Sequence, residues 1–108
     1  MKLRQWEVWK TKPAGFDQAH WFVLLSNQER LDSPRHHAVN GLCCFTLRGE
    51  PEKSDVRLDA ADGLERPSVC NCDFIWVLEK QLLIDSRGSV SWERIQAIKA
   101  KLKERLRL

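Results

Sequence analysis

The chain lacks any long apolar run. Its longest uninterrupted hydrophobic stretches, residues 21–25 and 74–78, have five residues each, far below the roughly 20 residues that a helix needs to span a bilayer. No apolar stretch follows the basic start Met1-Lys2, so the pattern of a secretory signal is missing as well. We therefore expect no membrane association and a cytoplasmic location.

Glycine and proline are scarce, and tyrosine is absent. Five glycines and four prolines in 108 residues exclude a collagen-like chain. A hydrophobic fraction of 43% and a charged fraction of 31% are ordinary for a globular protein and exclude a disordered one. The length predicts one domain spanning residues 1–108.

The four cysteines allow two interpretations. Cys70 and Cys72, together with His36 or His37, could bind zinc, although zinc sites usually separate their cysteines by two to four residues. Alternatively the thiols are reduced and buried. Residues two apart on a strand point to one face, whereas the adjacent Cys43 and Cys44 point to opposite faces. The second interpretation is favoured, so we expect no metal and no cofactor.

Short apolar or alternating segments predict strands rather than helices along most of the chain. The expected strands cover residues 5–10, 20–25, 41–47 and 56–58, with one or two more within 69–78. The segment at 20–25 contains a continuous apolar run, which is typical of a strand buried on both faces, and the strand at 41–47 is also expected to be buried. Residues 27–37 and 49–54 are expected as loops, 79–83 as a short helical turn and 85–88 as a turn.

The last segment, residues 91–106, predicts an amphipathic helix. Ser91 is a good N-cap, and Glu93 lies in the first turn, where the helix dipole favours a negative charge. An apolar stripe then recurs at three- and four-residue steps: Trp92, Ile95, Ile98, Leu102 and Leu106. The segment is basic, which fits a nucleic acid, an acidic partner or simply a solvated face. Together these elements predict a mostly β fold, a small antiparallel barrel of five to seven strands with the helix closing one side.

Several segments carry a family likeness in their order along the chain. They are Trp6-Glu7-Val8-Trp9, Asp17-Gln18-Ala19-His20 with the aliphatic run that follows, Leu42-Cys43-Cys44-Phe45-Thr46, residues 73–80, and residues 88–102. Together they resemble the MazF/PemK family of bacterial toxin ribonucleases over nearly the whole chain. The resemblance implies an SH3-like barrel, a homodimer and control by a cognate antitoxin protein. It also implies metal-independent cleavage of single-stranded RNA to 2′,3′-cyclic phosphate and 5′-OH ends.

The departures from the family pattern concern its functional residues. Where the family usually has Arg-Pro, its arginine being the main catalytic residue, this chain has His20-Trp21. Where the family has Gln and Arg after an acidic residue, this chain has Phe74 and Trp76. The alternative function is therefore a catalytically impaired barrel that binds protein or nucleic acid. Gyrase poisons of the CcdB type share the fold but end in an apolar, Trp-containing segment, unlike residues 103–108 here.

Cleavage of this type needs a base for the 2′-OH, an acid for the leaving oxygen, and donors for the phosphate charge. Histidine can exchange a proton near neutral pH, so we expect His20, Thr46 and Arg48 to be the catalytic group, with Asp17 orienting His20. A further set is expected to contact RNA: Asp17, Gln18, Trp21, Arg35 and His36. For Trp21 the alternative is core filling, and for Arg35 and His36 it is a solvated loop.

Overall fold

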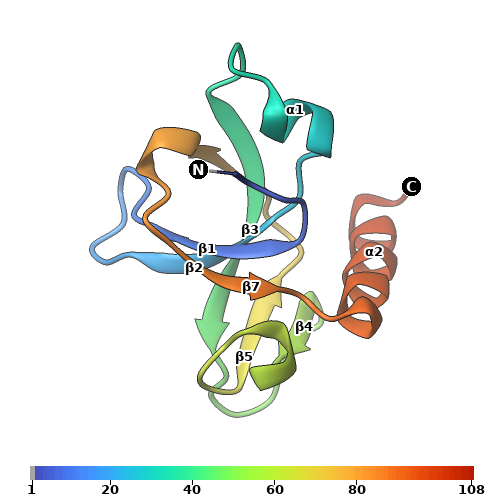
Figure 1. The fold of residues 1–108 in the computed structure, drawn as a ribbon. Helices are drawn as coiled ribbons and strands as arrows, with labels where there is room; N and C mark the ends of the chain where they lie inside the picture. Colours follow the sequence, from blue (N-terminus) through green and yellow to red (C-terminus); the bar gives the residue numbers. More distant parts are fainter. Residues whose placement is uncertain (1) are drawn as a thin grey trace.

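The computed structural model describes residues 2–108 and consists of a curled antiparallel sheet with a helix beside it (Figure 1). The strands are β1 (Glu7–Thr11), β2 (His20–Leu24), β3 (Ala38–Thr46), β4 (Asp55–Leu58), β5 (Ser68–Asn71), β6 (Trp76–Glu79) and β7 (Asp85–Ser89). The helices are α1 (Gln28–Asp32), α2 (Trp92–Leu106) and the 3₁₀ turns η1 (Ala60–Asp62) and η2 (Lys80–Leu82). Seven strands and a terminal helix confirm the predicted fold class. No helix within residues 2–108 has the length and hydrophobicity that a membrane crossing requires.

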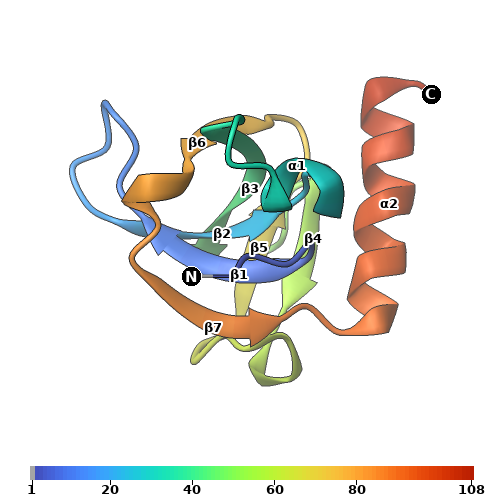
Figure 2. The ribbon, with the colours of Figure 1, turned by 45° about the horizontal axis from the view of Figure 1, so that its top comes forward.

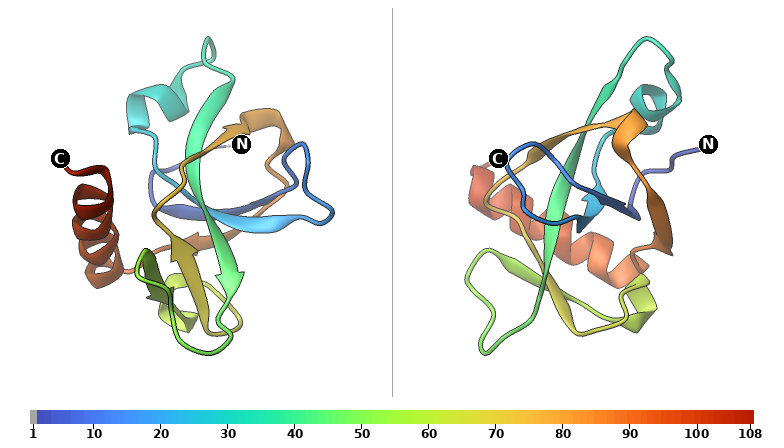
Figure 3. Two further views of the ribbon diagram at one scale, coloured as in Figure 1. Left: turned by 180° about the vertical axis from the view of Figure 1, so that it is seen from behind. Right: turned by 90° about the vertical axis from the view of Figure 1, so that its left-hand side faces the viewer.

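Strand β3 organises the sheet, whose order is β4-β5-β3-β2-β1-β7 with β6 also paired to β3. The first half of β3 pairs with β6, from Ala38 to Gly41, and its last three residues pair with β5. Strand β2 pairs with its middle, where Phe22 lies opposite Cys43. Because one long strand joins these partners in turn, the sheet bends around it, as the views from behind and from the side show (Figure 3).

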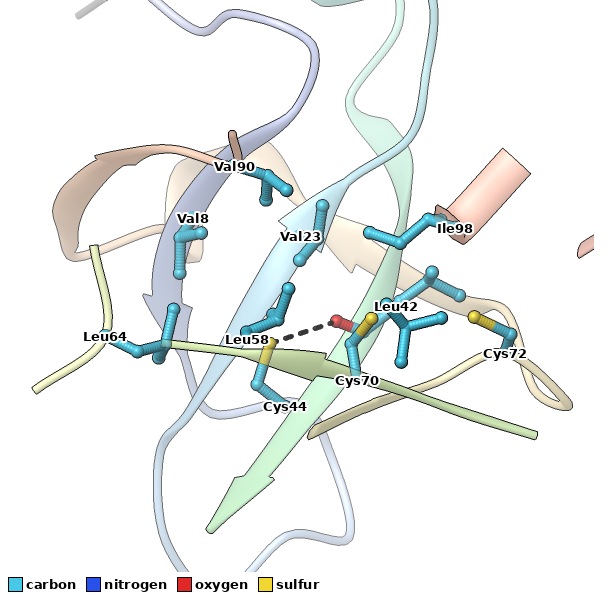
Figure 4. Packing of buried hydrophobic residues seen from close by; sticks show 11 residues of the cluster. Val8, Val23, Leu42, Cys44, Leu58, Leu64, Cys70, Cys72, Val90 and Ile98 are labelled. Carbon is cyan, nitrogen blue, oxygen red and sulfur yellow. Dashed lines mark hydrogen bonds between the residues drawn. The ribbon is translucent and has the colours of Figure 1, made fainter. Parts of the chain in front are cut away.

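The core lies on both faces of β2 and β3. Val23 belongs to one buried cluster with Val8, Leu42 and Ile98, as Figure 4 shows. Its chain neighbours Phe22 and Leu24 belong to a second cluster that includes Val39 and Leu78. Alternate residues therefore fill opposite sides, which explains why the sequence runs apolar without alternation. The predicted burial fails only toward the end of β3, where Phe45 and Thr46 are exposed.

All four cysteines are free thiols and buried, as predicted. Cys44, Cys70 and Cys72 belong to the first cluster, whereas Cys43 belongs to the second, so the adjacent pair does point to opposite faces. Burial raises the pKa of the Cys43 thiol to about 12. A hydrogen bond between Cys70 and Cys72 raises the pKa of Cys70 and lowers that of Cys72. Within residues 2–108 no group of three or more His, Cys, Asp or Glu side chains is placed to bind a metal ion.

Helix α2 stands beside the sheet and contacts it along a narrow stripe (Figure 2). Ile98 is fully buried, and Ile95 and Leu102 are partly buried against the first cluster, as predicted. Trp92 is 71% exposed, so its predicted packing role is wrong. Trp92 is the first residue of α2, shortly after the end of β7, and most of its side chain is not covered by the core. Ser91 is the N-cap residue, but its hydroxyl donates to Asp62 at 2.8 Å instead of capping the helix.

The basic side chains of α2 make internal ion pairs. Arg105 Nε donates to Asp73 Oδ1 at 2.8 Å, and an Arg94 amino group lies 3.4 Å from Asp59 Oδ2. A hydrogen bond from Ser54 and the pairing with Arg105 lower the pKa of Asp73. Part of the basic charge therefore attaches the helix to the barrel instead of facing an external acidic partner.

Two short elements depart from the predicted loops and turns. Residues 27–37 include helix α1, which Asn27 caps by accepting a hydrogen bond from the Arg30 amide at 2.8 Å. Residues 85–88 lie in strand β7, whose side chains are all exposed. Its backbone pairs with the edge of β1, so no apolar alternation marks it in the sequence. Strand β3 also begins three residues earlier than predicted, at Ala38.

We expect Ile98→Ala to reduce the free energy of unfolding by about 2 to 5 kcal/mol, because a fully buried side chain would leave a cavity. Trp92→Ala, on the exposed side of the same helix, should cost less than about 0.5 kcal/mol. Denaturant unfolding of both variants measures the difference. Equal losses would contradict the packing of α2 described above.

Candidate active site

A cavity of about 510 Å³ opens where β2 begins and β3 ends. Five of the predicted functional residues line it together: Gln18, His20, Trp21, Thr46 and Arg48. These residues come from segments more than 20 positions apart in the sequence. The fold therefore assembles all three members of the predicted catalytic group at one place.

The antiparallel register of β2 and β3 explains this meeting. Phe22 lies opposite Cys43, so the start of β2 faces the end of β3, and the His20 and Phe45 rings are 5.6 Å apart. Thr46 is the last residue of β3. Arg48 lies two residues beyond the end of β3 and lines the same cavity.

His20 is held by its own loop. Its Nδ1 lies 3.1 Å from the carbonyl oxygen of Gln18, and its ring packs edge-on against Phe16 with 5.2 Å between centroids. A carbonyl oxygen only accepts, so this hydrogen bond requires the proton on Nδ1 and leaves Nε2 free. The predicted orienting partner, Asp17, is not the hydrogen-bond partner: the Gln18 backbone supplies this contact, and Asp17 is exposed.

Trp21 lines the cavity but its ring is already in contact with cations. The Arg87 guanidinium lies 5.0 Å from the ring centroid and Lys10 Nζ lies 5.8 Å from it. Lys10 is the cross-strand partner of Trp21 between β1 and β2, which explains the contact. Because cation–π attraction uses the ring face, Trp21 is better placed to hold these cations than to stack on a base.

Two arginines at the site were not predicted from the sequence: Arg66 and Arg87. Arg66 lines the main cavity, and with Trp21 and Arg87 it also lines an adjoining cavity of about 210 Å³. Arg87 forms an ion pair with Glu65. Arg66 lies between η1 and β5 and Arg87 lies in β7. Neither has a spacing relation to His20, so only the folded chain brings them near it.

Arg35 and His36 lie apart from this site, before the opposite end of β3. That strand spans nine residues, about 26 Å at roughly 3.3 Å per residue. His36 Nδ1 lies 3.0 Å from Ser33 Oγ within its own exposed loop. The fold therefore does not bring Arg35 and His36 to the phosphate that His20 would contact. Any nucleotide that these two residues contact would be distant from that phosphate along the RNA chain.

Chemically, the main cavity combines a proton-transfer group, a hydroxyl donor and two cations: His20, Thr46, Arg48 and Arg66. No carboxylate lines it. An anion such as a phosphodiester would meet donors and positive charge on several sides there, without an opposing negative group.

No family model and no curated protein matches the chain, but solved structures do. It superimposes with a TM-score of 0.82 on a mycobacterial endoribonuclease in complex with its cognate antitoxin, at 21% identity, covering 99% of this chain and 95% of that one. A mycobacterial endoribonuclease gives 0.80 at 23% identity, covering 100% and 94%. Mycobacterium tuberculosis toxin MazF-mt6 gives 0.78 at 21% identity, covering 94% and 97%. The chain therefore has the fold of MazF-type toxins, as its sequence predicted.

Proposed function

We propose that the protein is a toxin that cleaves single-stranded RNA without a metal ion and acts in the cytoplasm. The observation that carries the proposal is the cavity that joins His20, Thr46 and Arg48. It lies in a fold whose solved examples include mycobacterial endoribonucleases. The replacement of the family's arginine by His20 changes the chemistry of the site without removing a group able to transfer protons.

In the proposed reaction the ribose 2′-oxygen attacks the neighbouring phosphorus. His20 Nε2 is free, because Nδ1 is engaged by the Gln18 carbonyl, and it accepts the 2′-OH proton. The bond from phosphorus to the 5′-oxygen breaks, and that oxygen takes up a proton from water. The hydroxide left behind removes the proton that His20 accepted, which returns His20 to its starting state. The products are a 2′,3′-cyclic phosphate and a 5′-OH. Thr46 donates a hydrogen bond to a phosphate oxygen, while Arg48 stabilises the charge that develops on the phosphate.

Purified protein free of antitoxin should cleave single-stranded RNA in the presence of EDTA. The protein's own side chains supply the proton transfer and the charge stabilisation in this mechanism, so removing metal ions should not stop the reaction. End-labelled RNA incubated with and without EDTA, with the product ends tested for cyclic phosphate and 5′-OH, measures this. Full inhibition by EDTA, with recovery on adding Mg²⁺, would contradict the mechanism. Binding of RNA without cleavage would favour the impaired barrel.

Two protein partners belong to the same proposal. A neighbour with this fold was solved in complex with its cognate antitoxin, and we propose that an antitoxin also binds this chain. We further propose a homodimer. Four apolar side chains are exposed on β6 and the segments on either side of it, a surface named here the β6 face: Ile75, Val77, Leu82 and Ile84. Val77 and Leu82 line one cavity, and exposed apolar side chains that lie together are typical of an interface.

The variant Val77→Asp should convert the dimer to a monomer, because Val77 is 66% exposed in the single chain and would become buried between two copies. A carboxylate buried without a partner opposes association strongly. Multi-angle light scattering at micromolar concentration measures the mass. Leu106→Asp, an exposed apolar position on α2, is the control and should stay dimeric. A monomeric wild type would contradict the proposed assembly.

A further inference from the structure

A second cavity adjoins the candidate active site. It has a volume of about 450 Å³, within the range of small-molecule pockets, and shares Phe45, Thr46 and Arg48 with the cavity that holds His20. Its lining includes the aromatic residues Phe45, Phe74 and Trp76, called here the aromatic wall, and also the acidic residues Glu50 and Glu52. We name it the aromatic cavity. Because Thr46 and Arg48 line both spaces, a chain bound at the phosphate site has direct access to it.

The aromatic wall is built by ring contacts that begin at His20. Phe16 lies 5.2 Å from His20 and 4.8 Å from Trp76, measured between ring centroids. Phe74 in turn lies 4.6 Å from Trp76. The ring centroid of Phe45 lies 5.6 Å from that of His20. The wall is therefore anchored to the proposed catalytic residue, at a fixed place relative to it.

The wall is nevertheless open to solvent. Phe74 is 57% exposed and Phe45 is 43% exposed. Alternation along β6 puts Trp76 and Val77 on opposite faces, so the aromatic wall is separate from the β6 face proposed for the dimer. Exposed aromatic rings at a nucleic-acid site offer flat faces on which bases stack.

Three acidic residues also line the aromatic cavity: Glu50, Glu52 and Asp55. Asp55 is already satisfied, because it accepts hydrogen bonds from Asn71 Nδ2 at 3.2 Å and from the Glu52 amide at 2.8 Å. The carboxylates of Glu50 and Glu52 have no hydrogen-bond or ion-pair partner within residues 2–108. These acceptors would repel a phosphate but suit a ligand that brings N–H donors. The occupant therefore combines a flat ring with donor groups at its edge.

We propose that the aromatic cavity binds the base next to the scissile phosphate and prefers a base with an exocyclic amino group to uracil. This inference rests on the proposed RNA cleavage. Adenine, cytosine and guanine each present an amino group to the carboxylates. Uracil has a single N–H donor between two carbonyl oxygens, which face the carboxylates unfavourably. Stacking on Phe74 and Trp76 supplies binding, and Glu50 and Glu52 supply the selection.

The test maps the cleavage sites of wild type in a mixed-sequence RNA. Uracil should be depleted at one of the two positions that flank the cut. The double variant Glu50→Gln with Glu52→Gln should cleave with that depletion largely lost, since an amide both donates and accepts. Glu29→Gln with Glu93→Gln, exposed carboxylates on α1 and α2, is the control and should retain the depletion.

Stacking is tested by Phe74→Ala. This variant should raise KM by about 5- to 100-fold with kcat much less affected, as expected for the loss of one base–aromatic contact. Trp92→Ala removes an aromatic ring that is 71% exposed and does not line the aromatic cavity, so this variant should leave KM unchanged. Light scattering of Phe74→Ala should give the wild-type mass. A change of assembly would place Phe74 in an interface and overturn the proposal.

The two proposals fail in different ways. If wild type cleaves RNA with equal frequency beside every base, or if Phe74→Ala keeps the wild-type KM, the base site is wrong and the ribonuclease stands. If wild type does not cleave at all, the proposed function fails. Binding of short oligonucleotides with a 2′-deoxy sugar at every position, measured by anisotropy, then decides the base site alone. Adenine or cytosine oligonucleotides should bind more tightly than uracil ones, and equal affinities would overturn the inference.

Discussion

Replacing His20 by alanine should lower the rate of RNA cleavage by roughly 10² to 10⁴, the usual contribution of one positioned acid or base. His20 lines the cavity with Thr46 and Arg48, and its Nε2 is free for proton transfer. The loss should appear mainly in kcat, because the imidazole acts on the reacting proton and binds little of the substrate.

Three further variants separate chemistry from folding. Thr46→Ala should lower the rate through the lost phosphate contact, whereas His36→Ala, at the far end of β3, should keep the wild-type rate. His20→Arg restores the family's residue, and activity retained there would show that the site geometry is intact. Unchanged cleavage in both His20→Ala and Thr46→Ala would rule out the proposed site. Circular dichroism of each variant checks that the fold persists.

Much of the fold was predictable because it depends on local apolar patterns. The continuous run of Phe22, Val23 and Leu24 predicts a strand buried on both faces, and alternate residues do enter two separate clusters. The periodic stripe of α2 correctly predicts Ile98 as its buried centre. Strand β7 was missed because it has only exposed side chains and is held by backbone pairing with β1. Backbone hydrogen bonds do not depend on the side chain, so such a strand has no characteristic pattern in the sequence.

The site was predictable where it lies on, or within two residues of, the strands that the family pattern marks. His20 and Thr46 come together because the register of β2 and β3 is set by buried residues. Arg66 comes from a connecting segment, and its approach depends on how η1 and β5 pack. The aromatic cavity was likewise hidden, since Phe74 and Trp76 read in sequence only as departures from the family. Their proposed role follows only from the cavity that they line.

A single buried carboxylate links helix α2 to the barrel. Asp62, in η1, is fully buried. Its Oδ1 accepts hydrogen bonds from both the amide and the hydroxyl of Ser91 at 2.8 Å, and its Oδ2 accepts one from the Asp59 amide at 2.9 Å. Arg94 Nε lies 3.7 Å from Oδ2. One side chain thus completes the capping box of η1 and holds the residue at which α2 begins.

We expect Asp62→Ala to reduce the free energy of unfolding by about 2 to 5 kcal/mol, because it leaves the Ser91 and Asp59 amides without an acceptor and Arg94 without its buried partner. Asp73→Ala is the matched control. It removes the exposed carboxylate that pairs with Arg105 of α2 and should reduce the free energy of unfolding far less. Denaturant unfolding measures both variants. Hydrogen exchange should show the amides of α2 losing more protection than those of β2 and β3 in Asp62→Ala, because the helix loses its attachment while both faces of the sheet keep their core. Equal small losses in the two variants would mean that α2 is held by Ile98 packing alone.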